Sequence, residues 1–492
     1  MKKLNNILNG IKYSGKIDER VINAIFYDSR KVQENSLFIA IKGMNYDGHQ
    51  YIDQAIKLGA NAIVVDKIIQ KSYSVPILKV KNTRKAMSQI ASNFFGDCSK
   101  NIKITAVTGT NGKTTIIELV NHILENNNYQ TSSLGTLGFK GPSGVINTGF
   151  TTPESLELQQ IFYILNTGGI THLNMEISSH AIKLNRVDNV DVDIAVFTNL
   201  TNEHLDFHRT INNYFNTKLK LFKNLSANKI AIINNDDIYS NKIKNQTKAK
   251  VFTYGFNSNS DIFPEKIIMD LKGSTFYVNY KNKRFQINTN LIGNFNISNI
   301  LASILVCKNI GLKMRSIINS INSFKSVSGR CEFYTKKNGG IIIIDYAHTP
   351  DAFEKILSTI KGINSKKQII TLFGCGGNRD KSKRSIMGEI SDKYSNKTII
   401  TDDNPRYESS EEIISQILSG FKTRNYEIIN NRKRALEKSI NELDGSKVLL
   451  VLGKGAENYQ IIKDKKIYHS DLEIIKKLIW ELKLKKRDYL RN

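Results

Sequence analysis

Short runs of apolar residues recur along the chain, and longer amphipathic segments separate many of them. The clearest runs are Ile102–Val107, Asp193–Phe197, Lys229–Ile233, Gly340–Ile344, Gln368–Phe373, Lys397–Ile400 and Lys447–Leu452. Apolar runs of this length are typical of strands that are buried on both faces of a parallel sheet. Because helix-like patterns lie between many of them, the sequence predicts βαβ units and an α/β fold with doubly wound sheets.

Polar and glycine-rich residues follow directly after these predicted strands. TGTNGKTT follows Val107, TNLTNEHLD follows Phe197 and NNDD follows Ile233, while the four later strands lead into DYAHTPD, GCGGNRDK, TDDNPR and GKGAENYQ. Open α/β sheets bind ligands at the carboxyl ends of their strands. The repeated pattern therefore predicts two sheets whose ligand-binding edges face shared substrates.

Three domains are expected, with boundaries at 1–98, 99–328 and 329–492. The first contains the sequence DSR at 28–30 and a predicted strand at Ala62–Val65. The second holds a β-rich stretch at 249–290, and the segment SVSGRCEF at 326–333 is interpreted as the linker into the third. A chain of this length is consistent with two to four domains.

Composition restricts the location and the redox environment of the protein. The chain has 492 residues, 40% hydrophobic and 24% charged, as in ordinary globular proteins. No apolar run reaches the roughly 18 residues of a membrane span, and no apolar segment follows the lysines of MKKLNNILNG as in a secretory signal. The cysteines, Cys98, Cys307, Cys331 and Cys375, are scattered, which favours free thiols in a reducing compartment. We therefore expect a cytoplasmic protein.

The net charge of +26 leaves two interpretations open. Basic proteins can bind nucleic acid or other anions. Here the lysines are spread along the whole chain, and no compact basic block is flanked by aromatic residues. A compositional bias of the whole chain is the favoured interpretation, and no nucleic-acid partner is expected.

The segment Gly109-Thr110-Asn111-Gly112-Lys113-Thr114-Thr115 follows a predicted strand and opens a predicted helix. Glycines allow the backbone amides to approach a polyphosphate, and the helix start adds positive potential. In such loops the lysine reaches the β- and γ-phosphates and the first hydroxyl holds Mg²⁺. Val107 stands where a glycine is usual, so this is a variant of the P-loop that predicts nucleotide binding without specifying the reaction.

Further motifs occur along the chain in a characteristic order: MEISSH (175–180), FTNLTNEHLDFH (197–208), LIGNFNISN (291–299), DYAHTPD (345–351), DDNPR (402–406) and GKGAENYQ (453–460). Together with TGTNGKTT they resemble the Mur ligase family over nearly the whole chain. The resemblance implies a three-domain architecture with a central P-loop domain and a Rossmann-like C-terminal domain. It also implies ATP-dependent ligation of meso-diaminopimelate to UDP-N-acetylmuramoyl-L-alanyl-D-glutamate through an acyl phosphate, a step of peptidoglycan precursor synthesis.

The resemblance assigns the phosphoryl-transfer chemistry to Lys113, Glu176, His204 and Lys218. Thr114 and Glu176 are the expected ligands of one Mg²⁺, and His204 is expected to help bind a second. Lys218 corresponds to a carbamylated lysine of the family, whereas its helical position alone favours a lysine in solvent. Asn296 and Asn299 correspond to residues of the nucleotide pocket, and Arg330 and His348 to ATP-contacting residues of the third domain.

The first domain is expected to hold the UDP end of the UDP-linked substrate. The residues that the resemblance assigns to this substrate are Tyr27, Ser29, Met44, Asn45, Tyr46, Thr151, Thr152, Ser178 and Arg186. For the small hydroxyls among them, helix capping is the alternative explanation.

Asp403-Asn404-Pro405-Arg406 distinguishes the amino acid that is added. Diaminopimelate carries a carboxylate that lysine lacks, and a guanidinium can bind a carboxylate through two parallel hydrogen bonds. Arg406 and Arg379 are expected to supply such groups, and Gly453 and Glu457 to contact the ammonium and carboxylate at the far centre. A proline-containing turn followed by a surface arginine is the alternative.

Three positions depart from the pattern of this type of ligase: Ala456 replaces a usual histidine, Leu184 a glutamine of some members, and Asn378 a common aspartate. Other functions remain as alternatives, namely a ligase that adds L-lysine or another amino acid, a folylpolyglutamate synthase, or a basic P-loop ATPase that acts on nucleic acid. ATP, Mg²⁺ and the two other substrates are the expected ligands, and a monomer is expected.

Overall fold

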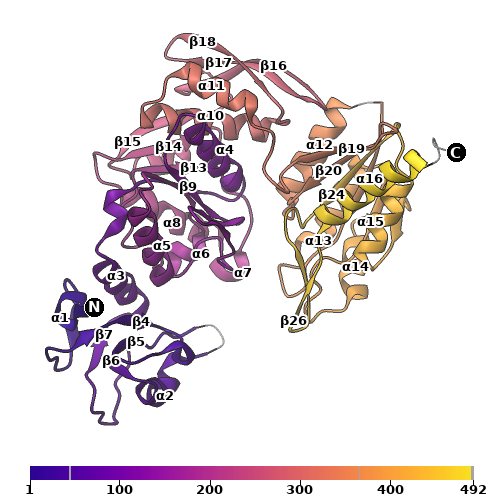
Figure 1. Cartoon of the computed structure of the whole chain (residues 1–492). Coiled ribbons are helices and arrows are strands. Elements are labelled where there is room, and N and C mark those ends of the chain that lie inside the picture. The colour runs from indigo at the N-terminus through magenta and orange to yellow at the C-terminus, as the bar shows by residue number, and fades with distance from the viewer. Residues whose placement is uncertain (44–45, 365, 489–492) are drawn as a thin grey trace.

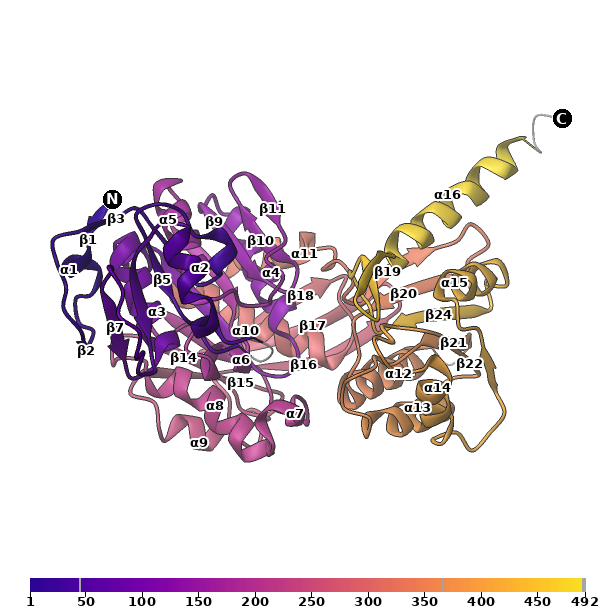
Figure 2. The ribbon, with the colours of Figure 1, turned by 90° about the horizontal axis from the view of Figure 1, so that it is seen from below.

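Three α/β bodies follow one another along the chain in the computed structural model (Figure 1). The structure describes residues 1–43, 46–364 and 366–488, and within them the strands form large sheets of five, eleven and six strands. The amino terminus lies beside α1 in the first body (Figure 1), and α16 projects from the third body (Figure 2). The central body adjoins both of the others.

The first body is a small α/β unit. Its elements are β1 (Lys2–Lys3), α1 (Leu4–Ile7), β2 (Tyr13–Ser14), β3 (Val21–Ile22), β4 (Ala24–Phe26), β5 (Ser36–Ile39), α2 (Ile52–Lys57), β6 (Ala60–Val65), β7 (Ile77–Val80) and α3 (Thr83–Phe95). The sheet order is β2-β7-β6-β5-β4, with β4 to β7 parallel and β2 antiparallel to β7. Leu37 and Phe38 point to opposite faces of the sheet and join separate apolar clusters, so both faces are buried.

The central body carries the longest sheet, in the order β11-β10-β9-β12-β8-β13-β14-β15-β16-β17-β18. Its elements are β8 (Lys103–Thr108), α4 (Lys113–Glu125), β9 (Thr131–Gly135), β10 (Gly138–Gly141), β11 (Gly144–Ile146), α5 (Ser155–Thr167), β12 (His172–Glu176), α6 (Ser179–Lys183), β13 (Ile194–Phe197), α7 (Leu205–His208), α8 (Ile211–Lys223), β14 (Ile230–Asn234), α9 (Ser240–Lys244), β15 (Lys250–Tyr254), β16 (Ile262–Asp270), β17 (Gly273–Tyr280), β18 (Lys283–Thr289), α10 (Asn294–Ile310) and α11 (Met314–Ser323). Strands β9, β12, β8, β13, β14 and β15 are parallel, and each end of the sheet finishes in antiparallel hairpins. Consequently the carboxyl ends of β8, β12 and β13 lie side by side.

The third body is built on a sheet in the order β19-β20-β24-β21-β22-β23, parallel except for β19. Its elements are β19 (Glu332–Thr335), β20 (Ile341–Asp345), α12 (Pro350–Ile363), β21 (Gln368–Phe373), α13 (Lys383–Tyr394), β22 (Lys397–Ile400), α14 (Ser410–Leu418), β23 (Tyr426–Ile428), α15 (Arg432–Asn441), β24 (Lys447–Leu452), β25 (Tyr459–Ile462), β26 (Lys465–Tyr468) and α16 (Asp471–Asp488). Apolar clusters cover both faces of this sheet. The loops after β20, β21, β22 and β24 therefore open at one common edge.

Strands β16 to β18 reach from the central body towards the third body (Figure 1). Leu271, in the turn between β16 and β17, belongs with Ile292 and Phe295 to the same apolar cluster as Phe353 and Ile356 of α12. The two bodies are thus joined by apolar packing as well as by the chain between α11 and β19.

Each strand predicted from the apolar runs is present, with bounds that agree to within one residue. Three of these strands lie in the central sheet and four in the sheet of the third body, and β6 contains the strand predicted at Ala62–Val65. Each large sheet lies within one of the ranges 1–98, 99–328 and 329–492, while the boundaries themselves stay a prediction. Within the described residues, no helix has both the length and the apolar composition needed to cross a lipid bilayer.

We expect Asp471→Ala to destabilise the third body by about 3–5 kcal/mol, because it leaves a buried arginine unpaired. Arg432 and Asp471 are both fully buried, and Arg432 Nη2 donates to Asp471 Oδ2 at 2.7 Å and to Leu452 O at 3.0 Å. Urea unfolding followed by tyrosine fluorescence and circular dichroism measures the effect. The control is Glu437→Ala, which removes an exposed helix pair with Lys433 and should leave the unfolding midpoint unchanged; equal midpoints for both variants would contradict the expectation.

Candidate functional site

The loop between β8 and α4 requires glycine at two positions. Gly109 and Gly112 have φ of +148° and +92°. A Cβ atom on Gly109 would lie 1.9 Å from Thr198 Oγ1, and one on Gly112 would lie 2.5 Å from Asn299 Oδ1. Because α4 begins at Lys113 directly after this loop, its amino-terminal end adds positive potential there.

Lys113 folds back over its own loop. Its Nζ donates to Gly109 O at 3.0 Å and to Thr110 O at 2.8 Å. A phosphate bound in the loop would offer this ammonium a charged acceptor in place of two carbonyl oxygens, which is the stronger type of hydrogen bond. The geometry is therefore that of an anion-binding loop with a lysine beside it.

A buried carboxylate lies next to the loop. Glu176, at the end of β12, accepts hydrogen bonds from Thr114 Oγ1 at 2.8 Å and from Thr136 N at 2.9 Å. In the part of the chain that the structure describes, Glu176 forms no ion pair, and a buried carboxylate without a counter-charge is costly. The hydroxyl and carboxylate are hard oxygen donors that suit Mg²⁺. Among the described residues no three His, Cys, Asp or Glu side chains form a complete metal site, so an ion here would take further ligands from phosphate and water.

Lys218 is fully buried on α8 and faces the phosphate loop. Its Nζ donates to Gly109 O at 2.9 Å and lies 4.6 Å from the centre of the Tyr214 ring. The expectation from helical position alone, a lysine in solvent, is wrong, because this face of α8 packs beneath the loop. Burial, and then the charge of Lys113, lower the pKa of Lys218 well below its usual value. More of this lysine is therefore the neutral amine at neutral pH than is usual for a lysine.

Glu203 links His204 to the third body. His204 Nε2 lies 3.7 Å from Glu203 Oε2, and His348 Nε2 lies 3.3 Å from Glu203 Oε1. Burial alone would raise the pKa of Glu203, but the contacts with His348 and His204 hold it below its usual value. A carboxylate that stays ionised therefore lies between two imidazoles from different bodies.

Two further contacts join the third body to the loop. Asn111 Nδ2 donates to Asp351 Oδ2 at 3.0 Å, and Arg330 Nη2 donates to Thr114 Oγ1 at 3.2 Å. The Arg330 guanidinium also lies 4.2 Å from the centre of the Tyr346 ring. The predicted phosphate loop and the predicted third-domain residues are thus brought together.

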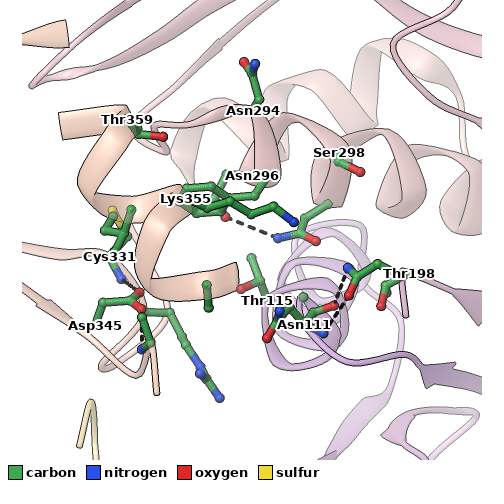
Figure 3. Close-up of a pocket in the computed structure, with 18 of the residues that line it drawn as sticks. Asn111, Thr115, Thr198, Asn294, Asn296, Ser298, Cys331, Asp345, Lys355 and Thr359 are labelled. Carbon is green, nitrogen blue, oxygen red and sulfur yellow. Dashed lines mark hydrogen bonds between the residues drawn. The ribbon is translucent and has the colours of Figure 1, made fainter. Parts of the chain in front are cut away.

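A cavity of about 470 Å³ adjoins the loop between the central and third bodies (Figure 3). This volume lies within the roughly 300–1,000 Å³ of small-ligand sites. Asn296 and Asn299 line it, with Asn299 Nδ2 donating to Asn296 Oδ1 at 3.3 Å. Phe256 and Phe295 add aromatic surface on the same side. The cavity thus combines amide groups and rings that suit a nucleobase beside a loop that suits phosphates.

The candidate residues of the first body differ in how far they are buried. Ser29 is buried, and its Oγ donates to Gln54 Oε1 at 3.0 Å. Tyr27 Oη donates to Glu157 Oε1 of the central body at 2.7 Å, and burial, followed by Glu157, raises the pKa of Tyr27. The side chain of Tyr46 is exposed, and Met44 and Asn45 lie outside the described residues. Tyr27 therefore connects the first body to the central body.

The other candidates for that substrate surround the end of β12. Thr152 Oγ1 donates to Glu176 O at 2.9 Å, and Ser178 N donates to Thr152 Oγ1 at 3.1 Å. Arg186 Nη1 donates to Thr152 O at 2.9 Å, whereas its buried Nε has no partner among the described residues. Thr151 Oγ1 lies 3.2 Å from Thr136 Oγ1, which itself contacts Glu176. These residues therefore lie next to the phosphate loop. A substrate group that they bind would be close enough to receive a phosphoryl group from a nucleotide in that loop.

The amino-acid site predicted in the third body is built from three loops. Gly377 N donates to Asn404 O at 2.9 Å, Arg406 Nη1 donates to Gly377 O at 2.8 Å, and Arg406 N donates to Ile461 O at 3.0 Å. A Cβ atom on Gly377 would lie 1.9 Å from Pro405 O, so the first two loops are in direct contact. Arg406 has a φ of +54°, a backbone conformation that is unfavourable for arginine.

Two guanidinium groups lie close together in this site. Burial, and then the charge of Arg379, lower the pKa of Arg406. Arg379 is exposed, Arg406 is half-buried, and within the described residues neither forms an ion pair with a carboxylate. Such an arrangement favours an anionic ligand that can pair with both groups.

Two acidic residues, Asp403 and Glu457, lie on the loops next to the two arginines. Asn404 Nδ2 donates to Glu457 Oε2 at 3.4 Å. Gly453 has a φ of +106°, and a Cβ atom there would lie 3.0 Å from Asp403 Oδ2. Glycine therefore lets the loop after β24 approach Asp403, which brings the predicted residues of DNPR and GKGAE together.

The three residues that depart from the expected pattern, Asn378, Leu184 and Ala456, lie in different parts of the structure. Asn378 adopts a φ of +51° and its Oδ1 accepts a hydrogen bond from Tyr407 N at 3.0 Å, so it fastens the two arginine-bearing loops together. Leu184 ends α6, and Ala456 packs so closely against Gly329 that a Cβ on that glycine would lie 2.1 Å from Ala456 N.

Sequence reasoning missed Glu203, Asp351 and Lys454. Each stands within a motif that also holds a candidate residue, and each is charged and follows a buried strand. A systematic consideration of every charged residue at those strand ends would have found them, because the carboxyl ends of parallel strands converge. The partners of Glu203 and Asp351, which lie on other bodies, could not be found in this way.

Comparison with known proteins gives matches along the whole chain. The profile of the Mur ligase middle domain matches residues 107–307, that of the Mur ligase glutamate ligase domain matches 329–455, and that of the Mur ligase family catalytic domain matches 21–95. The chain is 40% identical over 485 residues to UDP-N-acetylmuramoyl-L-alanyl-D-glutamate--2,6-diaminopimelate ligase 1 of Clostridium acetobutylicum, covering 98% of this chain and 100% of that protein. It is 42% identical to the corresponding ligase of Clostridium botulinum, with 97% and 100% coverage. A solved structure of a UDP-N-acetylmuramoyl-L-alanyl-D-glutamate--2,6-diaminopimelate ligase superposes with a TM-score of 0.70 at 26% identity, over 98% of this chain and 99% of that one.

Proposed function

The chain belongs to the Mur ligase family, and within that family we propose that it joins meso-diaminopimelate to UDP-N-acetylmuramoyl-L-alanyl-D-glutamate. ATP transfers its γ-phosphoryl group to a carboxylate of the dipeptide. An amine of diaminopimelate then attacks the acyl phosphate, phosphate leaves, and an amide forms. Similarity along the whole chain to ligases that are named for this amino acid supports the proposal.

The observation that carries the choice of amino acid is the pair of neighbouring guanidiniums. Arg379 and Arg406 lack carboxylate partners within the described residues, and Asp403 and Glu457 lie on neighbouring loops. Diaminopimelate offers a carboxylate for the arginines and an ammonium for the acidic side chains. Lysine would leave the guanidiniums unpaired, which is the situation that binding sites reject most strongly.

ATP binding is assigned to the loop and to the cavity beside it. Residues 109–115 would hold the phosphates, Asn296 and Asn299 the base, and Arg330 and His348 would approach from the third body. Because ligands from both bodies are needed, their closure would exclude water and align the reactants. Lys113 would neutralise negative charge on the phosphoryl group while it is being transferred.

Mg²⁺ is part of the proposal. Thr114 and Glu176 would hold one ion, and His204 is proposed to help bind a second. When bound, such ions neutralise phosphate charge during transfer. The buried, unpaired carboxylate of Glu176 supports the first of these sites.

Carbamylation of Lys218 is also proposed. Carbon dioxide adds to a neutral amine, and the lowered pKa of Lys218 favours that form. The product is an anion, which would relieve the close approach of two lysines at the loop. Lys113 would then face a negative neighbour in place of a positive one.

The UDP-linked substrate is assigned to the junction of the first and central bodies. Ser29, Tyr27 and the segment 44–46 would contact its nucleotide end, and Thr151, Thr152, Ser178 and Arg186 its dipeptide. The contacts of Arg186 and Ser178 with Thr152 hold these candidates together at the end of β12, which supports this assignment. A cytoplasmic location and a monomeric state complete the proposal.

The deciding experiment measures phosphate release from ATP and Mg²⁺ with the UDP-muramoyl dipeptide, comparing meso-diaminopimelate with L-lysine. We expect turnover with diaminopimelate, at least about 1,000-fold lower kcat/KM with lysine, and no turnover after chelation of Mg²⁺ by EDTA. Preference for lysine would retain the ligase and reject the role of the arginines. Absence of turnover with both amino acids would reject both as acceptors, and other acceptors, including glutamate, would then be tested.

A further inference from the structure

Lys454 belongs to the loop that follows β24, and its side chain is fully buried. Its Nζ donates to Tyr459 O at 2.7 Å and to Asn404 Oδ1 at 3.3 Å. The same atom lies 3.4 Å from Glu457 Oε2 and 3.8 Å from Asp403 Oδ1. One ammonium thus contacts side chains from both loops to which diaminopimelate binding is assigned.

This placement is explained by charge. A buried ammonium is costly unless carboxylates and hydrogen bonds compensate it, and here Asp403 and Glu457 supply two negative charges. Arg432, another fully buried cation of the third body, is already paired with Asp471. Lys454, Asp403 and Glu457 therefore bring one formal positive charge and two formal negative charges together. Such a group matches one substrate ammonium.

The hydrogen bonds also fix directions. Asn404 Oδ1 accepts from Lys454 Nζ and from Ile461 N at 2.9 Å, so the amide nitrogen of Asn404 is turned towards Glu457 Oε2. The other Glu457 oxygen accepts a long hydrogen bond of 3.5 Å from Tyr346 Oη. The orientation of both Asn404 and Glu457 therefore depends on Lys454.

We propose that Lys454 is a positioning residue for diaminopimelate: it holds Glu457 and Asn404 in the orientation that receives the substrate ammonium, and it limits the negative charge of that subsite. This inference rests on the proposed function. Lys454 itself does not touch the substrate, because no part of its side chain is exposed. Its influence is exerted through Glu457 and Asn404 and should be confined to the amino-acid substrate.

The test is Lys454→Met in the full-length enzyme, with KM measured for each substrate. We expect the KM for meso-diaminopimelate to rise about 10- to 100-fold, because hydrogen bonds to a charged group are lost, while the KM for ATP and for the UDP-muramoyl dipeptide stay unchanged. The matched control is Lys465→Met, which removes an exposed lysine of β26 and should leave all three KM values unchanged. If Lys454→Met does not fold, Lys454→Gln, which keeps a donor without the charge, replaces it.

A double-mutant cycle with Glu457→Gln separates positioning from general support of the fold. If Lys454 acts through Glu457, the rise in KM caused by Lys454→Met becomes clearly smaller in the Glu457→Gln background. Additive effects, an unchanged KM for diaminopimelate, or equal rises for all three substrates would overturn the inference. Wild-type enzyme that does not use diaminopimelate at all would instead reject the proposed function, so the two failures are distinguishable.

Discussion

Replacement of Lys113 by alanine is expected to lower kcat by about 1,000-fold, the loss that follows removal of one preorganised group that stabilises charge in a transition state. Among the described residues, the hydrogen bonds of Lys113 Nζ are to two carbonyl oxygens of its own loop, at 2.8 and 3.0 Å, so it is available for a phosphate. Initial rates of phosphate release at saturating substrates measure the effect.

The control for this variant is Lys223→Ala, which removes an exposed lysine at the end of α8 and should retain wild-type kcat. Circular dichroism should show both variants to be folded, since Lys113 is not part of an apolar cluster. A Lys113→Ala enzyme with kcat within tenfold of wild type would show that this lysine does not neutralise the transferred phosphoryl group.

The second large effect is expected for Arg406→Ala with diaminopimelate as the acceptor. Loss of one partner of a buried charge pair costs about 2–5 kcal/mol, which corresponds to roughly a 30- to 5,000-fold decrease in kcat/KM. The kcat/KM for L-lysine should change little, because lysine has no carboxylate for this guanidinium. The discrimination between the two amino acids therefore decreases, and competition between them in one reaction measures it.

Arg434→Ala is the matched control, because this arginine lies exposed on α15 of the same body. Arg406→Lys adds a second comparison, since an ammonium keeps the charge but cannot form two parallel hydrogen bonds. If Arg406→Ala lowers kcat/KM equally for diaminopimelate and lysine, Arg406 supports the loop and does not bind the carboxylate of diaminopimelate.

The strands could be predicted from sequence because each is an apolar run that is buried on both faces. Gln368–Phe373 and Lys447–Leu452 agree at both ends with the structure, and the polar residues after them lie at a common edge as expected. Parallel pairing explains this success, since it places the ends of all such strands together.

Contacts between segments that are distant in the sequence could not be predicted in the same way. Helical position suggested an exposed Lys218, yet the side chain is buried, because the loop after β8 covers it. The approach of His348 to Glu203 joins residues 145 positions apart on separate sheets, and no local pattern encodes such a contact. Lys454 was missed because a lone lysine between two glycines has no periodicity that would mark it as buried.

The left-handed backbone of Arg406 carries an evolutionary consequence. A residue with a Cβ atom pays roughly 1–2 kcal/mol for this conformation, and here the backbone pairing of Arg406 with Ile461 and Lys463 holds it in place. Glycine at this position would make the folded chain more stable and would remove the guanidinium. Selection for thermal robustness alone would therefore erode substrate discrimination, and only continuing selection on the product keeps the strained arginine in the population.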